Sequence, residues 1–379
     1  MIFIKGVGMT QFGVQEETTS HMIHESSFEA LKDADISMND IDAIVLSNID
    51  ILSNGERQRH SASVLSSLFQ TKLPILTVPA GCAGGGIALW TAVKFLKSGN
   101  YKNIFVVAFE KFVSNISQKV TDEMVMGTER IYEQAEGLNF PAVNALVAQQ
   151  YMLKYGATTD DLALVAYKNH QNAFLNPKAR FYKKEVTLNQ IKKSPVVASP
   201  LRLFDCSLSV NGADAAILTK DKADIEIAGS SLFVDRLSAF ESADMTSWEA
   251  SILAAKEAYS QAGVTPGEID IAELHDAFTS VELISYEDLG FCKKGDGKDL
   301  IRKGVTNING KLPVNTSGGL KAKGHPISAT GVSQIYELVK QMRKEAGERQ
   351  VGKSIKYALA QNIGGAGSTV AVHILKKVN

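Results

Sequence analysis

The chain has few cysteines, almost no net charge and no long apolar run. Its 379 residues include three cysteines, Cys82, Cys206 and Cys292, and no CxxC pair or cluster of histidine and cysteine that would indicate a zinc site. Three widely spaced cysteines cannot all form disulfides, so we expect free thiols in a reducing, cytoplasmic compartment. The formal net charge of −1 provides no overall field that would attract nucleic acid or an anionic membrane.

The lack of apolar runs argues against a membrane protein. No segment approaches the roughly 18 apolar residues of a membrane-spanning helix. The N-terminal MIFIKGVGMTQFG lacks the basic, apolar and small-residue regions of a secretory signal. The sequence therefore predicts a globular protein with no nucleic-acid partner and no membrane partner.

An internal sequence repeat indicates two similar halves. Residues 31–45, LKDADISMNDIDAIV, align without a gap with residues 259–273, YSQAGVTPGEIDIAE, so that Asp42 corresponds to Asp270. Each copy contains the end of a helical pattern, a turn and an apolar strand. A single repeat at this distance predicts a duplicated unit and excludes a solenoid, which repeats about every 20–50 residues.

Both halves have the alternating pattern of an α/β fold. We expect strands at 42–47, 73–78, 103–109, 213–219, 269–274, 354–360 and 368–375, and helices at 17–34, 83–98, 140–155, 159–174, 246–262, 279–289 and 331–343. Such alternation predicts a mostly parallel sheet with helices on both faces.

About a hundred residues separate the third and fourth of these strands, and a loop of that length without structure is uncommon in a compact domain. We therefore expect an inserted cap subdomain at 113–204. It would lie between an N-terminal half, 1–112 completed by 205–225, and a C-terminal half, 226–379. Two basic clusters in the insertion, KARFYKK and IKK, are either solvated surface or contacts for substrate phosphates.

The stretch LPILTVPAGCAGGGIALWTAV places Cys82 between an apolar strand and a glycine cluster. Apolar residues then recur at helical spacing up to Gly99, so Cys82 is predicted in a strand-to-helix turn. Unpaired backbone N–H groups and the positive end of the helix dipole would lower the pKa of a thiol there, which favours a nucleophile. The alternative is a small buried residue with no chemical role.

Two histidines stand in turns that could hold catalytic groups. His275 follows a predicted strand in ELHDAFT, and His325 lies within NTSGGLKAKGHPISATG. An imidazole titrates near neutrality, so His325 suits the base that takes the proton of Cys82, and His275 suits polarising a second carbonyl. The remaining histidines have no such setting: His21, His24, His60, His170 and His373.

No nucleotide cofactor is expected. Gly319 and Gly324 have the spacing of a P-loop, but His325 follows where a P-loop requires lysine. The glycines around Cys82 lack GxGxxG spacing. The combination of Cys82, the two histidines and the glycine-rich turns favours covalent thiol chemistry, with backbone N–H groups holding a developing oxyanion.

Over essentially its whole length the chain resembles the thiolase superfamily. The resemblance rests on GCAGGG, DCSLSVNGADAA, HDAF, GGLKAKGHPISATG and NIGGAGST. HDAF, in place of the NEAF of the commonest thiolases, resembles the sterol-carrier-protein and archaeal-type branch. The resemblance implies two pseudo-symmetric five-layered α/β/α/β/α halves, a cap domain inserted in the first half, and a homodimer or dimer of dimers. It also implies acyl transfer with coenzyme A thioesters as substrates, and no covalently bound cofactor and no metal.

The resemblance also implies roles for individual residues. Cys82 would be the acyl-accepting nucleophile, and His325 the base that activates it and later an oxyanion donor. His275 would hold the enolate oxygen through a water. The backbone N–H groups of Cys82 and Gly364 would form a second oxyanion hole. Asn315 and Asn362 are possible supporting residues.

Two positions depart from the family pattern. Thiolases use a second cysteine to move the proton of the α-carbon, and its two family positions are occupied here by Asn362 and Ala277. An amide and a methyl group cannot act as a general acid or base at neutral pH. The groups needed to form the acyl-enzyme are therefore present, whereas the group that usually moves the α-carbon proton is missing. His275 or His325 would have to act as that base as well.

The preferred function is acetoacetyl-CoA thiolase (acetyl-CoA C-acetyltransferase), with ping-pong Claisen chemistry and a role in lipid metabolism such as the mevalonate pathway. Two alternatives stay open: a C-acyltransferase for an already nucleophilic acceptor such as a phenolic ring, and a weakly active scaffold subunit. The resemblance further implies acetyl-CoA and acetoacetyl-CoA as small-molecule partners. A small zinc-ribbon and OB-fold protein and HMG-CoA synthase are the implied protein partners.

Overall fold

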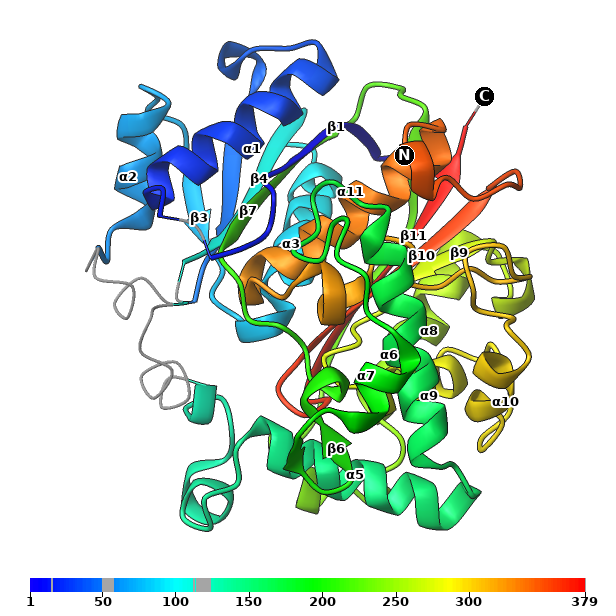
Figure 1. The fold of residues 1–379 in the computed structure, drawn as a ribbon. Coiled ribbons are helices and arrows are strands. Elements are labelled where there is room, and N and C mark those ends of the chain that lie inside the picture. The colour runs from blue at the N-terminus through cyan, green and yellow to red at the C-terminus, as the bar shows by residue number, and fades with distance from the viewer. Residues whose placement is uncertain (15, 50–57, 112, 114–123, 379) are drawn as a thin grey trace.

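The computed structural model describes residues 1–14, 16–49, 58–111, 113 and 124–378 (Figure 1). The strands are β1 (Phe3–Met9), β2 (Ala43–Ser47), β3 (Ile75–Thr77), β4 (Asn103–Glu110), β5 (Val196–Ala198), β6 (Leu201–Arg202), β7 (Gly212–Thr219), β8 (Ile225–Val234), β9 (Ile271–Glu273), β10 (Tyr357–Gly364) and β11 (Thr369–Lys377). The α-helices are α1 (Thr19–Ala34), α2 (Ser61–Leu68), α3 (Gly84–Ser98), α5 (Phe140–Tyr155), α6 (Thr159–Phe174), α7 (Leu188–Lys193), α8 (Glu249–Ala262), α9 (Thr279–Asp288), α10 (Gly297–Arg302) and α11 (Thr330–Arg343). Within these residues no helix combines the length and apolar character needed to cross a bilayer.

Nine of the described strands form one hydrogen-bonded sheet in the order β3-β2-β4-β7-β1-β8-β11-β10-β9. The pairing of β1 with β8, at Phe3 with Glu226 and Ile4 with Ile225, joins the two halves. The β2–β3, β2–β4 and β9–β10 pairs are parallel, and the other pairs are antiparallel. The expectation of a mostly parallel sheet is therefore wrong, because β10 and β11 are joined by a tight loop, which can only connect antiparallel strands.

Three apolar clusters divide the described part of the molecule into five layers. The middle cluster joins the inner helices α3 and α11 to strands of both halves, with Ala88, Leu89, Val332 and Ile335 buried among them. A second cluster packs α1 and α2 on the outer face of the first half, and a third packs α8 and α9 on the second. Figure 1 shows α3 and α11 crossing between the two parts of the sheet. The expected thiolase fold is confirmed, but five layers in each half is wrong: the layers α/β/α/β/α are formed by the two halves together, because both halves share the middle layer of α3 and α11.

The segment between β4 and β7 packs on the second half, although it is inserted in the first. Apolar residues of α5 and α6 share a cluster with α9. The buried Lys168 of α6 forms an ion pair with Glu282 of α9, with 2.5 Å between Nζ and Oε1. In Figure 1 the helix α6 lies beside α7, α9 and α10, and α5 lies below them, in contact with α9. The domain boundaries stay a prediction, and residues 114–123 of the expected cap lie outside the described residues.

The internal sequence repeat corresponds to a repeated set of hydrogen bonds. Both α1 and α8 lead through a 3-10 turn with a capping box into a strand, β2 or β9. The Oδ2 of Asp42 accepts the N–H groups of Lys102 and Asn103, at 2.6 and 2.9 Å. The Oδ2 of Asp270 accepts those of Lys356 and Tyr357, at 2.7 and 3.0 Å. Each aspartate fixes the start of the neighbouring strand.

We expect Asp270→Ala and Asp42→Ala each to lower the free energy of unfolding by about 1–3 kcal/mol, because two backbone donors lose a charged acceptor. Asp270→Asn retains an acceptor oxygen and should lose less than Asp270→Ala. Urea denaturation of the three variants measures the differences. Equal stability of Asp270→Ala and the natural protein would show that these bonds do not hold the strand.

Candidate active site

Cys82 lies in a tight turn between β3 and α3, as the sequence predicts. A 3-10 turn spans Gly81–Ala83 and α3 follows directly. Gly81 has a φ of +52°, in the left-handed region that favours glycine. A Cβ on Gly86 would lie 2.8 Å from the Cβ of Ala371, so the missing side chain lets the first turn of α3 lie against β11.

The imidazole of His325 lies beside the thiol of Cys82. The His325 Nε2 is 3.3 Å from the Cys82 Sγ, and the His325 Nδ1 is 2.6 Å from the Thr330 Oγ1. For Nε2 to accept the thiol proton, Nδ1 must carry the ring proton and donate it to Thr330. The His325 backbone N–H donates to the Leu208 carbonyl at 2.8 Å, which holds the loop. The site thus contains a thiol and a base that come from different halves of the chain.

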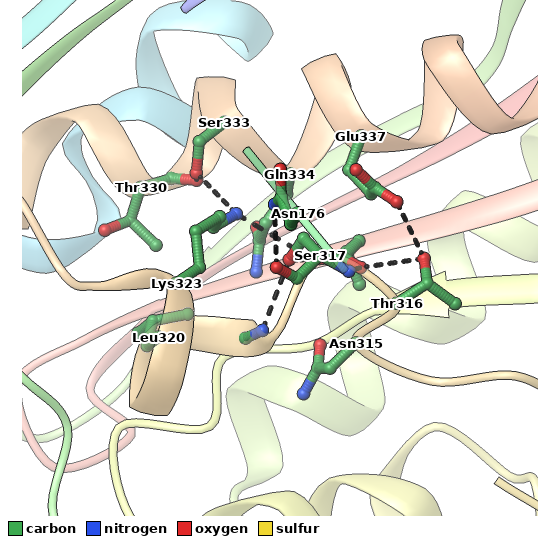
Figure 2. Close-up of polar contacts among 12 residues, drawn as sticks. Asn176, Asn315, Thr316, Ser317, Leu320, Lys323, Thr330, Ser333, Gln334 and Glu337 are labelled. Carbon is green, nitrogen blue, oxygen red and sulfur yellow. Dashed lines mark hydrogen bonds and ion pairs between the residues drawn. The ribbon is translucent and has the colours of Figure 1, made fainter. Parts of the chain in front are cut away.

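Behind His325, a buried lysine orders the start of α11. The Lys323 Nζ donates to the Ser333 Oγ at 3.0 Å, and that hydroxyl donates to the Thr330 carbonyl at 2.8 Å. Figure 2 shows Lys323 reaching Ser333 on the helix, next to Thr330. Lys323 is 1% exposed, so its charge is shielded from solvent. This arrangement fixes the residue that accepts the His325 Nδ1 proton.

The Asn362 side chain joins the Cys82 turn to His275. Its Oδ1 accepts the Gly86 N–H at 3.0 Å, and its Nδ2 donates to the Cys82 carbonyl at 2.9 Å. These two bonds determine which end of the amide carries the hydrogens, so the Nδ2 faces the His275 Nδ1, at 3.3 Å, as a donor. The His275 Nδ1 is therefore an acceptor and its ring proton lies on Nε2. His275 therefore offers the Nε2–H to a ligand as a donor. The role of α-carbon base, which the sequence left open for His275, would require the other tautomer.

Asn315 lies beside Thr316 in Figure 2, in the segment that leads toward Lys323. Its Oδ1 accepts the Leu274 N–H at 2.7 Å, and its Nδ2 donates to the Glu282 Oε2 at 2.8 Å. The φ of Asn315 is +56°, a conformation that asparagine tolerates better than most residues. Asn315 therefore supports the residue that precedes His275.

Cys82 borders two cavities. One, of about 300 Å³, is also lined by His275, His325 and Cys206. The other, of about 690 Å³, is also lined by Gly364. A Cβ on Gly364 would lie 3.1 Å from the Ala83 Cβ, so the end of β10 lies close to the Cys82 turn. The structure thus brings together Cys82, His275, His325, Asn362 and Gly364, which are far apart in sequence.

Burial determines the protonation of the pair. It raises the pKa of the Cys82 thiol to about 12, with a contribution from the Glu110 carboxylate, against a hydrogen bond within Cys82 itself. Burial, together with the Lys323 ammonium, lowers the pKa of His325 to about 3. Burial and then His325 lower the pKa of His275 well below its ordinary value. The resting pair is therefore a neutral thiol and a neutral imidazole, and the expected lowering of the Cys82 pKa is wrong because burial outweighs the helix terminus.

Several supporting residues were not identified from the sequence. The imidazole of His373 donates from Nε2 to the Gly86 carbonyl, at 3.0 Å, below the first turn of α3. The signal available in the sequence for His373 was its place as a polar residue within the apolar run VAVHIL. Thr330 and Lys323 gave no signal, because their role depends on how α11 packs. Within the described residues no group of His, Cys, Asp and Glu could hold a metal ion.

We expect the alkylation rate of Cys82 by iodoacetamide to increase about tenfold per pH unit between about pH 7 and 9, since only the thiolate reacts and its pKa lies above this range. Glu110→Gln removes a negative charge and should shift the profile toward lower pH. Mass spectrometry of the peptide that contains Cys82 separates its rate from those of Cys206 and Cys292. A rate independent of pH in this interval would indicate a preformed thiolate–imidazolium pair instead.

Comparisons with known proteins agree with this geometry. The family model "Thiolase, N-terminal domain" matches residues 2–200, and the model "Thiolase C-terminal domain-like" matches residues 232–377. The acetyl-CoA acetyltransferase of Methanothermobacter thermautotrophicus is 36% identical over 384 residues, covering 99% of both chains. Sterol carrier protein 2 of Bos taurus is 33% identical over 392 residues, covering 97% of this chain and 71% of that protein.

The solved structure of an aldolase named "Ltp2-ChsH2(DUF35) aldolase" has a TM-score of 0.84 and 25% identity, covering 99% of this chain and 97% of that chain. The resemblance to the sterol-carrier-protein and archaeal branch is confirmed by the two relatives above. The chain belongs to the thiolase family and is an acyltransferase.

Proposed function

We propose that the chain is an acetoacetyl-CoA thiolase (acetyl-CoA C-acetyltransferase) that works through an acyl-Cys82 intermediate. The observation that carries the proposal is the 3.3 Å between the Cys82 Sγ and the His325 Nε2, at the wall of two cavities. The name of the archaeal relative supports acetyl-CoA as the substrate.

The first half-reaction would start from the neutral pair. As the Cys82 Sγ attacks the thioester carbonyl, its proton passes to the His325 Nε2. Thr330 accepts the hydrogen of Nδ1 and so supports the imidazolium that forms. The leaving coenzyme A thiolate then takes the proton. Backbone N–H groups of Cys82 and Gly364 would hold the oxyanion on this side of the thiol.

In the second half-reaction, the enolate of another acetyl-CoA would attack acetyl-Cys82. The Nε2–H of His275, held in that tautomer by Asn362, is the proposed donor to the enolate oxygen. The ring of His325 is close by, with 5.3 Å between the two ring centroids. Once its Nε2 has received the proton released as the enolate forms, His325 would act as a donor during the attack.

A second candidate function is acyl transfer to an already nucleophilic carbon, such as that of a phenolic ring. Asn362 and Ala277 carry no thiol, and an acceptor of this kind needs no α-carbon base. Cleavage of acetoacetyl-CoA by coenzyme A discriminates the two functions, because only a thiolase produces two molecules of acetyl-CoA. Cys82 acetylation without this cleavage would favour the second candidate.

The wider setting stays a prediction. We expect a homodimer or dimer of dimers, a cytoplasmic location, and a role in the mevalonate pathway. The name of the matched aldolase lists a second component, which is labelled DUF35. Its presence in that complex supports a search for a small zinc-ribbon and OB-fold partner here, and HMG-CoA synthase is a further expected partner.

We expect incubation with acetyl-CoA to add one acetyl group to Cys82, detected by mass spectrometry of the intact chain and its peptides. Cys82→Ala should abolish the adduct and the thiolysis of acetoacetyl-CoA. Cys82→Ser should be nearly as inactive, because a hydroxyl is far less ionised than a thiol. More than a few per cent of thiolytic activity in Cys82→Ala would exclude the covalent mechanism.

We expect His325→Ala to abolish acetylation of Cys82, whereas His275→Ala should retain it and lose condensation about a hundredfold to a thousandfold, as for a lost oxyanion donor. Burst acetylation and steady-state condensation are measured on the same preparations. Equal loss of both steps in His275→Ala would place His275 in the first half-reaction and contradict its proposed role.

A further inference from the structure

The second half-reaction requires a group that carries a proton to and from the α-carbon. Among the described residues that line the cavity of about 300 Å³, the titratable side chains are those of Cys82, Cys206, His275 and His325. Cys82 carries the acyl group, and the His325 Nε2 faces it. His275 presents Nε2–H, because its Nδ1 accepts from Asn362. Cys206 is the titratable group that remains.

Cys206 is held at the cavity wall by its neighbours in the chain. The Asp205 carboxylate accepts the Thr279 hydroxyl at 2.9 Å, which ties the segment to the start of α9. The Ser207 N–H donates to the Ala277 carbonyl at 2.7 Å, and Cys206 pairs with Phe278 in an isolated β-bridge. Cys206 therefore lies beside the HDAF turn that presents His275. The only hydrogen bond found for its thiol, among the described residues, is a long one of 3.5 Å to the Arg202 carbonyl.

The surroundings of Cys206 suit a thiol that loses and regains a proton. Burial raises its pKa to about 11, so the thiol is protonated at neutral pH and can donate. The buried Lys321 ammonium acts in the opposite direction and would stabilise the transient thiolate. Its Nζ donates to the Asp205 carbonyl at 2.7 Å, directly before Cys206 in the chain. Cys292, by contrast, is not among the residues that line either cavity.

We propose that Cys206 is the α-carbon acid and base of the reaction, an inference that rests on the proposed thiolase function. In the thiolysis direction, Cys82 attacks the 3-keto carbon of acetoacetyl-CoA and its proton passes to His325. The C2–C3 bond then breaks, leaving acetyl-Cys82 and the enolate of acetyl-CoA.

The protons balance through the two thiols. The Cys206 thiol donates its proton to C2 of the enolate and becomes a thiolate. The His325 imidazolium returns a proton to that thiolate, since both side chains line the same cavity. The neutral His325 then takes the proton of the incoming coenzyme A thiol, in the reverse of the first half-reaction, while the sulfur attacks acetyl-Cys82. Cys82 leaves as a thiolate and regains its proton from His325. Both cysteines and the histidine return to their starting forms, and no oxidant or reductant is required.

The test uses Cys206→Ala and Cys206→Ser, with Cys292→Ser as the matched control. Acetylation of Cys82 should stay within about twofold of the natural protein in all three variants, because the first half-reaction does not use Cys206. Thiolysis should fall about a hundredfold or more in both Cys206 variants, as for the loss of a general acid. It should be unchanged in Cys292→Ser. The serine variant keeps the size of the side chain, and circular dichroism establishes that each variant is folded.

A thiol returned to the same wall should restore part of the activity. Ala277 also lines this cavity, so Ala277→Cys in the Cys206→Ala background should recover thiolysis at least tenfold. Thiolysis by folded Cys206→Ala within about threefold of the natural protein would overturn the inference. So would a parallel loss of Cys82 acetylation in the serine variant. Failure of the natural protein itself to acetylate Cys82 or to cleave acetoacetyl-CoA would instead overturn the proposed function.

Discussion

The amide of Asn362 holds the site together. It accepts the Gly86 N–H in the first turn of α3, donates to the Cys82 carbonyl and donates to the His275 imidazole. Cys82 comes from the first half, whereas Asn362 and His275 come from the second, so this one side chain joins the two halves at the site. The same amide selects the His275 tautomer. An aspartate there would lose both donated hydrogen bonds, so the amide is required for its geometry even though it cannot move a proton.

Burial dominates the electrostatics of this site. A rise in the pKa of Cys82 from 9.0 to about 12 corresponds to about 4 kcal/mol against the thiolate. A helix terminus contributes about 0.3–2 kcal/mol in its favour. The thiol of the resting site is therefore neutral, and in the proposed function its attack on a thioester would be coupled to proton transfer to His325. Such a site avoids a permanently charged sulfur next to the Glu110 carboxylate, at the cost of requiring a base within hydrogen-bonding distance.

The elements with strong local signals could be predicted from the sequence, and those defined by packing could not. The helices α5 and α6 match their expected ranges of 140–155 and 159–174, because residues at their ends mark them: Asn139 and Gly156 cap α5, and Thr158 forms a capping box at the start of α6. The strand β1 was missed, since glycines interrupt it: a Cβ on Gly6 would lie 2.4 Å from the Ala30 carbonyl oxygen of α1, a contact that no local pattern reveals. At the site, motifs predicted roles for Cys82, His275 and His325, and the fold brings these three residues to one cavity. Cys206 was left without a role, because its proximity to the HDAF turn is created by the fold.

The origin of the two reacting groups has a consequence for synthesis. Cys82 and His325 are 243 positions apart, and α3 becomes enclosed only when α11 packs beside it. A nascent chain that has emerged from the ribosome as far as β7 carries Cys82 without His325, without Asn362 and without the strands β8 to β11 of the sheet. The pairing of Cys82 with His325 is therefore absent during most of translation and forms when the C-terminal elements pack against α3. An unfinished chain carries the Cys82 thiol without the base on which its proposed acylation depends.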